Sequence, residues 1–213
     1  MSRPAPRLWD ISPAIRADLP AWPGDTPFNA EHNARIGPGS PVNLSTITLS
    51  AHLGAHADAP LHTADGTASV AELDLAPFLG PCRVLDATGA RGRVAPEHVA
   101  PQLVKGVARA LLKTRADAPP EAWDPDFTAV APETIARLAD AGAILVGVDA
   151  PSIDPFDADS LDAHRAARER GLAVLEGLVL HEVPPGEYEL IALPLKLAGL
   201  DGSPVRAVLR EIR

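Results

Sequence analysis

The chain has 213 residues, a formal net charge of -9, one cysteine and an aromatic content of only 4%. Nucleic acids and anionic membrane surfaces attract basic patches, and no apolar run reaches the roughly 18 residues of a membrane span, so we expect neither as a partner. The N-terminus lacks an apolar signal-peptide core and Cys82 has no second cysteine to pair with, so we expect a cytoplasmic protein in which Cys82 is a small buried residue.

The first half of the sequence predicts short strands separated by turns. Residues 8–11 form an apolar strand candidate, and prolines fix residues 20–28 as a loop. Residues 42–54 alternate apolar and polar side chains, which predicts a strand that runs directly into a group of histidines. Residues 82–88 and 108–114 predict two further short strands.

The second half adds helices between strands. Residues 116–132 contain four prolines and a tryptophan, which predicts a surface loop, and Pro132 then opens a helix that ends at Gly142. The remaining predicted elements are a buried strand over 143–154, a helix over 160–171, an apolar element over 172–180 and closing strands over 188–197 and 204–212. Strands outnumber helices and few neighbours show a strand–helix–strand order. We therefore expect one α/β domain over residues 1–213 with a mixed or antiparallel central sheet, and an N-terminal arm over roughly residues 1–30.

Residues 52–62 hold three histidines and an aspartate, although the whole chain has only seven histidines. Imidazole and carboxylate at short spacing suit zinc, manganese, iron or cobalt, so His52, His56 and Asp58 are candidate metal ligands. A lone histidine is more often a satisfied structural residue, but three beside an aspartate favour a metal. Pro60 breaks a helix here, so we expect a turn whose small residues let the backbone wrap around an ion. The spacing leaves open whether one metal binds or two.

Glu176 is a lone carboxylate within the otherwise apolar residues 172–180, and His164 precedes it by twelve positions. A buried carboxylate needs a partner, and a metal and an arginine are equally compatible with this spacing. The sequence has no G-x-S-x-G motif, no Walker A loop and no G-x-G-x-x-G motif after a strand. Serine-nucleophile and phosphate-binding chemistries are therefore disfavoured.

The run from His52 to His62 is similar to the signature H-x-G-T/A-H-x-D-x-P-x-H of the cyclase-like metal-dependent hydrolases, and every position of the signature is present. Further segments resemble the bacterial kynurenine formamidase branch of that family, namely residues 10–13, 22–28, 54–62, 146–155, 164–180 and 189–209. The resemblance implies a swivelling β/β/α-like cyclase fold, a homodimer, and hydrolysis of N-formyl-L-kynurenine to L-kynurenine and formate in tryptophan degradation. Residues 116–132 match nothing in the family residue by residue.

The resemblance also implies a role for each site residue. Two divalent ions would bind per subunit, with Zn²⁺ as the expected metal and Mn²⁺ as an alternative. His52 and His56 would bind the first ion, His164 the second, Asp58 and Glu176 would bridge both, His62 would carry the proton, and Trp22 would line the substrate pocket. A hydroxide activated by both ions would attack the formyl carbon while His62 protonates the leaving amine.

Two alternatives stay open. The same metal cluster would serve a related amidase, cyclase or lactonase acting on another small substrate, since only the pocket would differ. A metal-binding module for storage or sensing is the alternative from another class. That module would have no use for His62 and would ordinarily recruit more cysteines than one.

Overall fold

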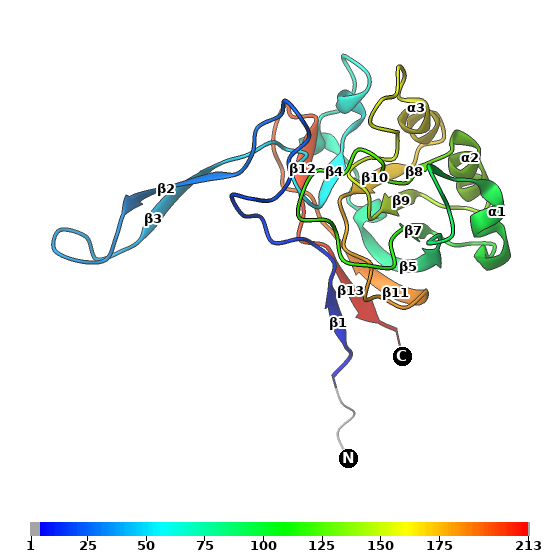
Figure 1. The fold of residues 1–213 in the computed structure, drawn as a ribbon, viewed down its shortest axis with the longest axis horizontal. Coiled ribbons are helices and arrows are strands. Elements are labelled where there is room, and N and C mark those ends of the chain that lie inside the picture. The colour runs from blue at the N-terminus through cyan, green and yellow to red at the C-terminus, as the bar shows by residue number, and fades with distance from the viewer. Residues whose placement is uncertain (1–4, 213) are drawn as a thin grey trace.

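Among the residues that the structure describes, nine strands form one mixed β-sheet (Figure 1). The computed structural model describes residues 5–212, so the first four residues of the expected N-terminal arm lie outside the described range. In order across the sheet the strands are β1 (Leu8–Asp10), β13 (Val208–Glu211), β11 (Gly186–Ile191), β5 (Leu79–Asp86), β7 (Arg109–Lys113), β9 (Leu145–Val148), β10 (Ala173–Glu176), β4 (His56–Asp58) and β12 (Gly202–Pro204). Neighbours from β5 to β10 run parallel, and all other neighbours run antiparallel. The predicted α/β class with a mixed sheet is confirmed.

Short helices connect the four parallel strands. α1 (Pro96–Val99) lies between β5 and β7, α2 (Pro132–Asp140) between β7 and β9, and α3 (Asp162–Glu169) between β9 and β10. Parallel neighbours need such crossovers. The expectation of few strand–helix–strand units was wrong for the centre of the sheet. The strand–helix–strand order is difficult to recognise in the sequence, because α1 is only four residues long and a long loop precedes α2.

The other regular elements are small. The strands β6 (Arg93–Val94) and β8 (Ala129–Val130) form a separate parallel pair, so the predicted loop over residues 116–132 contains one short strand. The 3₁₀ turns are η1 (Pro60–His62), η2 (Val70–Glu72), η3 (Ala76–Phe78) and η4 (Ala100–Gln102). Within residues 5–212, no helix has the length and apolar character needed to cross a membrane.

The central sheet is buried on both faces. Successive residues of a strand point to opposite faces, so Leu111 of β7 packs in one core while Ala110 and Leu112 pack in the other. The core that contains Leu112 also contains Ile135 of α2, so the helices cover this face. Cys82 is 4% exposed and belongs to the opposite core, as expected. Aliphatic side chains dominate both cores, which agrees with the low aromatic content.

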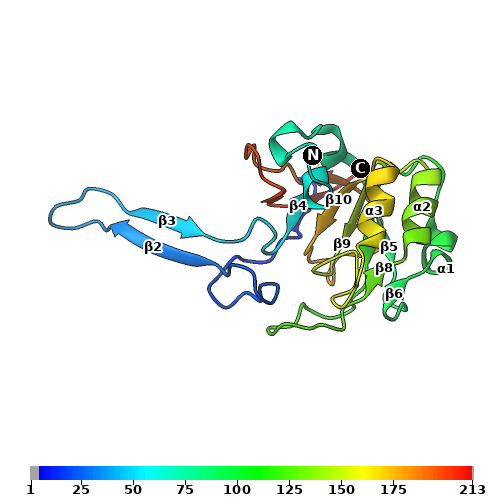
Figure 2. The same ribbon diagram turned by 90° about the horizontal axis from the view of Figure 1, so that it is seen from above.

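A β-hairpin of β2 (Asn29–Ala34) and β3 (Leu44–Thr48) projects away from the rest of the molecule (Figures 1 and 2). All five residues of β3 are exposed. The strand predicted over residues 42–54 is therefore present but ends at Thr48, and an irregular turn separates it from the histidines. Alternation of apolar and polar residues predicts an extended strand, but it does not say where the strand ends.

Candidate metal centre and adjoining cavity

The pairing of β4 with β10 brings candidate residues from distant parts of the sequence to one face of the sheet. The register places His56 opposite Glu176 and Asp58 opposite Val174. Residues two apart on a strand point to the same face, so His56, Asp58 and Glu176 project together. Each of these residues is at most 7% exposed. The sheet therefore assembles three polar side chains in a buried position.

The two carboxylates divide their oxygens between two groups of histidines. Asp58 Oδ1 lies 3.0 Å from His52 Nδ1 and 3.5 Å from His56 Nε2. Asp58 Oδ2 instead lies 3.3 Å from His164 Nε2. Glu176 repeats the division, with Oε2 at 3.4 Å from His56 Nε2 and Oε1 at 3.3 Å from His164 Nε2. Two potential ligand groups thus share Asp58, and the donor atoms within each group lie within 4.8 Å of one another.

His52, His56 and His164 each direct one ring nitrogen at Asp58 or Glu176, and the other ring nitrogen, here called the second, lies beside a hydrogen-bond acceptor. The pairs are His52 Nε2 with Asp201 Oδ2 (3.0 Å), His56 Nδ1 with the Gly54 carbonyl oxygen (2.9 Å) and His164 Nδ1 with Asp154 Oδ2 (2.7 Å). Because the second nitrogen donates to that acceptor, the first nitrogen is the one that can give its lone pair to a cation held among the carboxylates. Histidines that bind metals are usually held in this way.

Asp154 fixes His164 at the start of α3. Its Oδ1 accepts a hydrogen bond from Ala163 N at 2.9 Å, and its Oδ2 accepts one from His164 N at 3.0 Å. These are N–H groups of the first helical turn, which have no partner inside the helix. The same carboxylate holds the His164 ring, so helix position and ring orientation are set together.

The buried carboxylates of the site bind positive charge strongly. Burial raises the pKa of Asp58, but hydrogen bonds from His164 and His52 outweigh burial and hold this pKa well below its ordinary value. Burial lowers the pKa of His164, but the surrounding carboxylates, led by Glu176, raise it to about 12. The pKa of His52 is likewise raised to about 9, because Asp58 and Asp201 outweigh the effect of burial. A divalent cation would satisfy the same carboxylates in place of these protons.

The donor set fits a divalent metal site. Imidazole nitrogens and carboxylate oxygens without thiolates suit Zn²⁺, and also Mn²⁺, Fe²⁺ or Co²⁺. Glu176 forms its ion pairs with His56 and His164, and no arginine pairs with it within residues 5–212. The arginine alternative for this buried carboxylate is therefore excluded.

His62 lies beside the two ligand groups without contacting their carboxylates. It ends the 3₁₀ turn η1, and its Nδ1 is 3.4 Å from Asp201 Oδ2. The centroid of its ring is 4.3 Å from that of His52 and 5.6 Å from that of His164. Among the hydrogen bonds of the described residues, none occupies His62 Nε2. The ring lines a cavity, so this nitrogen is available to a bound molecule.

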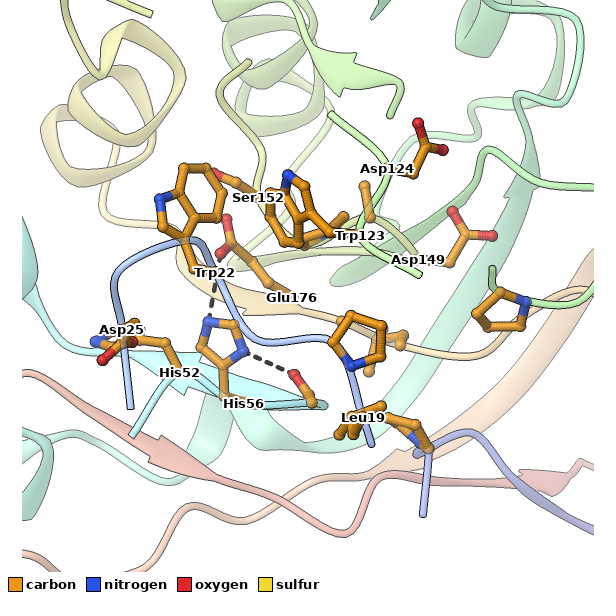
Figure 3. A pocket seen from close by; sticks show the side chains of 18 of the residues that line it. Leu19, Trp22, Asp25, His52, His56, Trp123, Asp124, Asp149, Ser152 and Glu176 are labelled. Atoms are coloured by element: carbon orange, nitrogen blue, oxygen red, sulfur yellow. Dashed lines mark hydrogen bonds and ion pairs between the residues drawn. The ribbon is translucent and has the colours of Figure 1, made fainter. Parts of the chain in front are cut away.

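That cavity has a volume of about 600 Å³ and lies over the histidines. Figure 3 shows Trp22, Trp123, His56 and Glu176 around it. The ring of Trp22 has its centroid 5.1 Å from that of Trp123 and 5.2 Å from that of Phe156. The cavity therefore has a polar floor of imidazole and carboxylate groups and an aromatic wall.

Comparison with known proteins identifies the family. Residues 9–155 match the family model described as "Putative cyclase". The chain belongs to the cyclase family. This cyclase-family chain is also 56% identical over 207 residues to the kynurenine formamidase of Delftia acidovorans (strain DSM 14801 / SPH-1), an alignment that covers 97% of this chain and 98% of the relative. The expected resemblance to bacterial kynurenine formamidases is confirmed.

Solved structures share the cyclase fold. A protein described as a predicted metal-dependent hydrolase from Bacillus stearothermophilus superposes with a TM-score of 0.83 at 28% identity, over 98% of this chain and 100% of its own. Isatin hydrolase A from Labrenzia aggregata, bound to benzyl benzoate, superposes with a TM-score of 0.82 at 25% identity, over 98% of this chain and 94% of its own. The fold expected for this cyclase-family chain is confirmed, and the chain is a hydrolase.

Three residues that contact the site were missed by the sequence analysis. They are Trp123, Asp154 and Asp201. The two aspartates lie in segments that resemble the family. Asp201 is 149 residues from His52, and Asp154, although only ten residues from His164, belongs to a different predicted element, so no motif links either aspartate to its histidine. Trp123 lies in the loop that matched nothing. Its one available signal was that it is one of only three tryptophans in the chain.

Proposed function

We propose that this protein hydrolyses N-formyl-L-kynurenine to L-kynurenine and formate, with two divalent metal ions bound per subunit. The observation that carries the proposal is the division of the Asp58 and Glu176 oxygens between two groups of histidines, next to an aromatic cavity. The 56% identity to a kynurenine formamidase supports the substrate. Zn²⁺ is the proposed metal, with Mn²⁺ as the alternative, because both accept imidazole and carboxylate ligands.

The ligand assignment follows the contacts of the two carboxylates. His52 and His56 would hold one ion and His164 the other, with Asp58 and Glu176 shared between them. When bound, the ions would lower the pKa of a water molecule and polarise the formyl oxygen. The neighbouring acceptors keep each ring in the orientation that presents a lone pair to the centre of the site.

His62 supplies the proton that the leaving amine needs. Hydrolysis joins a water oxygen to the formyl carbon and breaks the bond between that carbon and nitrogen, so the departing nitrogen must gain a proton. The Nδ1 of His62 faces Asp201, which leaves Nε2 as the donor toward the cavity. General acid catalysis of this kind contributes about 10²–10⁴ in rate.

The aromatic wall favours an aryl substrate. Trp22 and Trp123 would contact the aryl ring, and aromatic pairs contribute about 0.5–1.5 kcal/mol beyond the burial of their area. Arg115 and Asp124 also line the cavity and form an ion pair at 2.8 Å. They offer one charge of each sign to the amino acid end of the substrate.

The β2–β3 hairpin supports a homodimer. Four large apolar side chains of the hairpin and its loop are exposed: Ile36 (68%), Val42 (47%), Leu44 (55%) and Ile47 (60%). Apolar groups gathered on a projecting element usually mark an interaction surface. A second copy of this chain would bury them, and the resemblance to homodimeric enzymes selects this occupant.

Hydrolysis of a cyclic aryl amide is the second candidate function. The similarity to an isatin hydrolase at 25% identity favours it. Isatin is an amide whose nitrogen is attached to an aromatic ring, as the nitrogen of an aryl formamide is, so the same cluster and the same aromatic wall would serve. The two candidates differ in their products. Hydrolysis of an aryl formamide gives two separate molecules, an amine and formate, whereas hydrolysis of a cyclic amide gives one molecule that carries both the amine and the new carboxylate.

One experiment tests the proposal. The protein purified with Zn²⁺ is assayed for formate release from N-formyl-L-kynurenine, alongside formanilide, isatin and an alkyl formamide, and its metal content is measured by mass spectrometry. We expect two ions per chain and N-formyl-L-kynurenine as the best substrate. Faster hydrolysis of isatin would select the second candidate, and two ions without hydrolysis of any of the four compounds would contradict both candidates.

A further inference from the structure

One carboxylate, that of Asp201, contacts both a candidate metal ligand and the candidate proton carrier. Its Oδ2 lies 3.0 Å from His52 Nε2 and 3.4 Å from His62 Nδ1. The two rings are neighbours, with centroids 4.3 Å apart, so a single oxygen reaches both. Asp201 is far from both histidines in sequence and joins them only through the fold.

The backbone around Asp201 is anchored independently of these histidines. The carbonyl oxygen of Asp201 accepts a hydrogen bond from Ala59 N at 2.8 Å, and the next residue, Gly202, pairs with Asp58 in the sheet. A Cβ on Gly202 would lie 2.7 Å from Cε1 of His52, so the missing side chain leaves room for that ring. The backbone that carries the Asp201 carboxylate is therefore held by the pairing of β12 with β4.

The contacts of Asp201 determine which nitrogen of each ring carries a proton. An ionised carboxylate only accepts hydrogen bonds, so His52 Nε2 and His62 Nδ1 must both donate. His52 Nδ1, which is 3.0 Å from Asp58 Oδ1 and faces the first ligand group, is then the nitrogen that can give its lone pair to a metal ion there. For His62, the nitrogen left to exchange a proton with a bound molecule is Nε2.

We propose that Asp201 is a positioning residue that holds His52 for metal binding and His62 for proton transfer. The first half of this proposal, that Asp201 holds His52, concerns metal affinity alone. The second half, that Asp201 holds His62, rests on the proposed function. Asp201, His52 and His62 also form a set of donor atoms that could themselves hold an ion. The two arrangements differ because an ion in that set would bind Asp201 directly, whereas a positioning residue would not contact the metal.

The test uses Asp201→Asn, which keeps the shape of the side chain, and Asp201→Glu, which keeps its charge. Asp65→Asn is the matched control, because it removes an exposed carboxylate near His62 that contacts neither ring. Zn²⁺ affinity is measured on the metal-free proteins by competition with a chromogenic chelator. The absorption spectrum of the Co²⁺-loaded proteins reports the directly bound ligands, and kcat and KM are measured with Zn²⁺ in excess. Thermal unfolding of the metal-free proteins verifies that each variant folds.

For Asp201→Asn we expect about 10–100-fold weaker binding of one ion, unchanged binding of the other, and an unchanged Co²⁺ spectrum. We also expect kcat to fall about 10–100-fold at constant KM, with no further loss when Asp201→Asn is added to His62→Ala. Asp201→Glu should restore part of both properties, and Asp65→Asn should match the parent.

Loss of a ligand band in the Co²⁺ spectrum, or parental Zn²⁺ affinity in Asp201→Asn, would overturn the first half. A kcat loss that adds fully to that of His62→Ala would overturn the second. If the parent does not hydrolyse N-formyl-L-kynurenine, the proposed function fails while the affinity measurement still decides the first half.

Discussion

Gly177 lies so close to Gly54 that a Cβ at position 177 would come within 2.1 Å of the Gly54 carbonyl oxygen. Gly177 also has a φ of +65°, which is unfavourable for any residue other than glycine. It directly follows Glu176, and Gly54 lies between His52 and His56 in sequence. This one backbone contact therefore joins the end of β10 to the segment between His52 and His56, two of the candidate metal ligands.

We predict that Gly177→Ala lowers the free energy of unfolding by more than about 3 kcal/mol, because backbone strain and steric overlap add. The same substitution should weaken Zn²⁺ binding, since Glu176 and the turn can no longer approach each other. Gly171→Ala is the control, because Gly171 has a φ of +70° but nothing within 4 Å of its would-be Cβ. It should show only the strain, about 1–2 kcal/mol. Equal losses in urea unfolding of the two variants would mean that the Gly54 contact is unimportant.

The sequence predicted the candidate ligands better than their partners. His52, His56 and Asp58 fall within seven residues, and a short spacing of this kind is visible without a structure. Asp154 and Asp201 reach His164 and His52 from other elements, and nothing local in the sequence connects them. The candidate metal ligands could therefore be recognised in the sequence from their residue types and short spacing. The acceptors that orient them come together only through the register of the sheet.

The fold shows the same division between local and long-range information. Apolar runs in the sequence predicted most strands of the sheet, including β5, β7 and β9, because a strand that is buried consists mainly of apolar residues. The three-residue strand β12 and the hairpin strand β2 were not predicted. β12 is Gly-Ser-Pro, and β2 has four polar residues and two alanines but no large apolar side chain, so neither carries a strong apolar pattern. Pairing with a neighbouring strand makes them strands, and a single sequence does not report that pairing.

Cys82 should make the stability of the protein fall above pH 9. Burial raises the pKa of its thiol from 9.0 to about 12 in the folded chain. The folded state therefore holds this proton more tightly than the unfolded state, so the contribution is complete below pH 9 and is lost as the pH rises toward 12. At pH 10.5 the loss is about 2 kcal/mol. Urea unfolding of the parent and of Cys82→Ala at pH 8 and pH 10.5 measures it. An equal decline in both proteins would show that other groups cause the effect.

Ile47→Asp should convert a dimer to a monomer. Ile47 is 60% exposed on β3, and a charge at a buried dimer interface is costly unless it finds a partner. Leu75→Asp is the control, because Leu75 is 52% exposed but lies outside the hairpin. Light scattering after size-exclusion chromatography should give twice the chain mass for the parent and for Leu75→Asp. A monomeric parent with full activity at nanomolar concentration would refute the homodimer.

Glu176→Gln should reduce metal content more than His62→Ala does. Glu176 is proposed to lie between two cations, so its neutral isostere removes one negative charge that both ions share. Glu182→Gln makes the same change at an exposed carboxylate and should keep both ions. Metal content after gel filtration, measured per chain, decides the matter. If Glu176→Gln and His62→Ala retain both ions equally, Glu176 does not bridge them.

The last prediction separates His62 from the histidines beside it. Loss of a metal ligand should lower metal occupancy, because a coordinating bond is gone. Loss of a proton donor should leave occupancy intact and lower kcat by about 10²–10⁴ on a substrate whose leaving group needs a proton. His62 contacts Asp201 and the cavity but neither of the central carboxylates, so it belongs to the second class.

His62→Ala should therefore keep two ions, hydrolyse N-formyl-L-kynurenine poorly, and lose relatively little on an activated ester such as a nitrophenyl ester, whose leaving group departs without a proton. His52→Ala is the contrast, since it should lose metal and fail on both substrates. The ratio of amide to ester activity is the decisive quantity, because a general disturbance of the site lowers both rates together and leaves their ratio unchanged. An unchanged ratio in His62→Ala, or loss of an ion from it, would mean that the proton reaches the amine from another group.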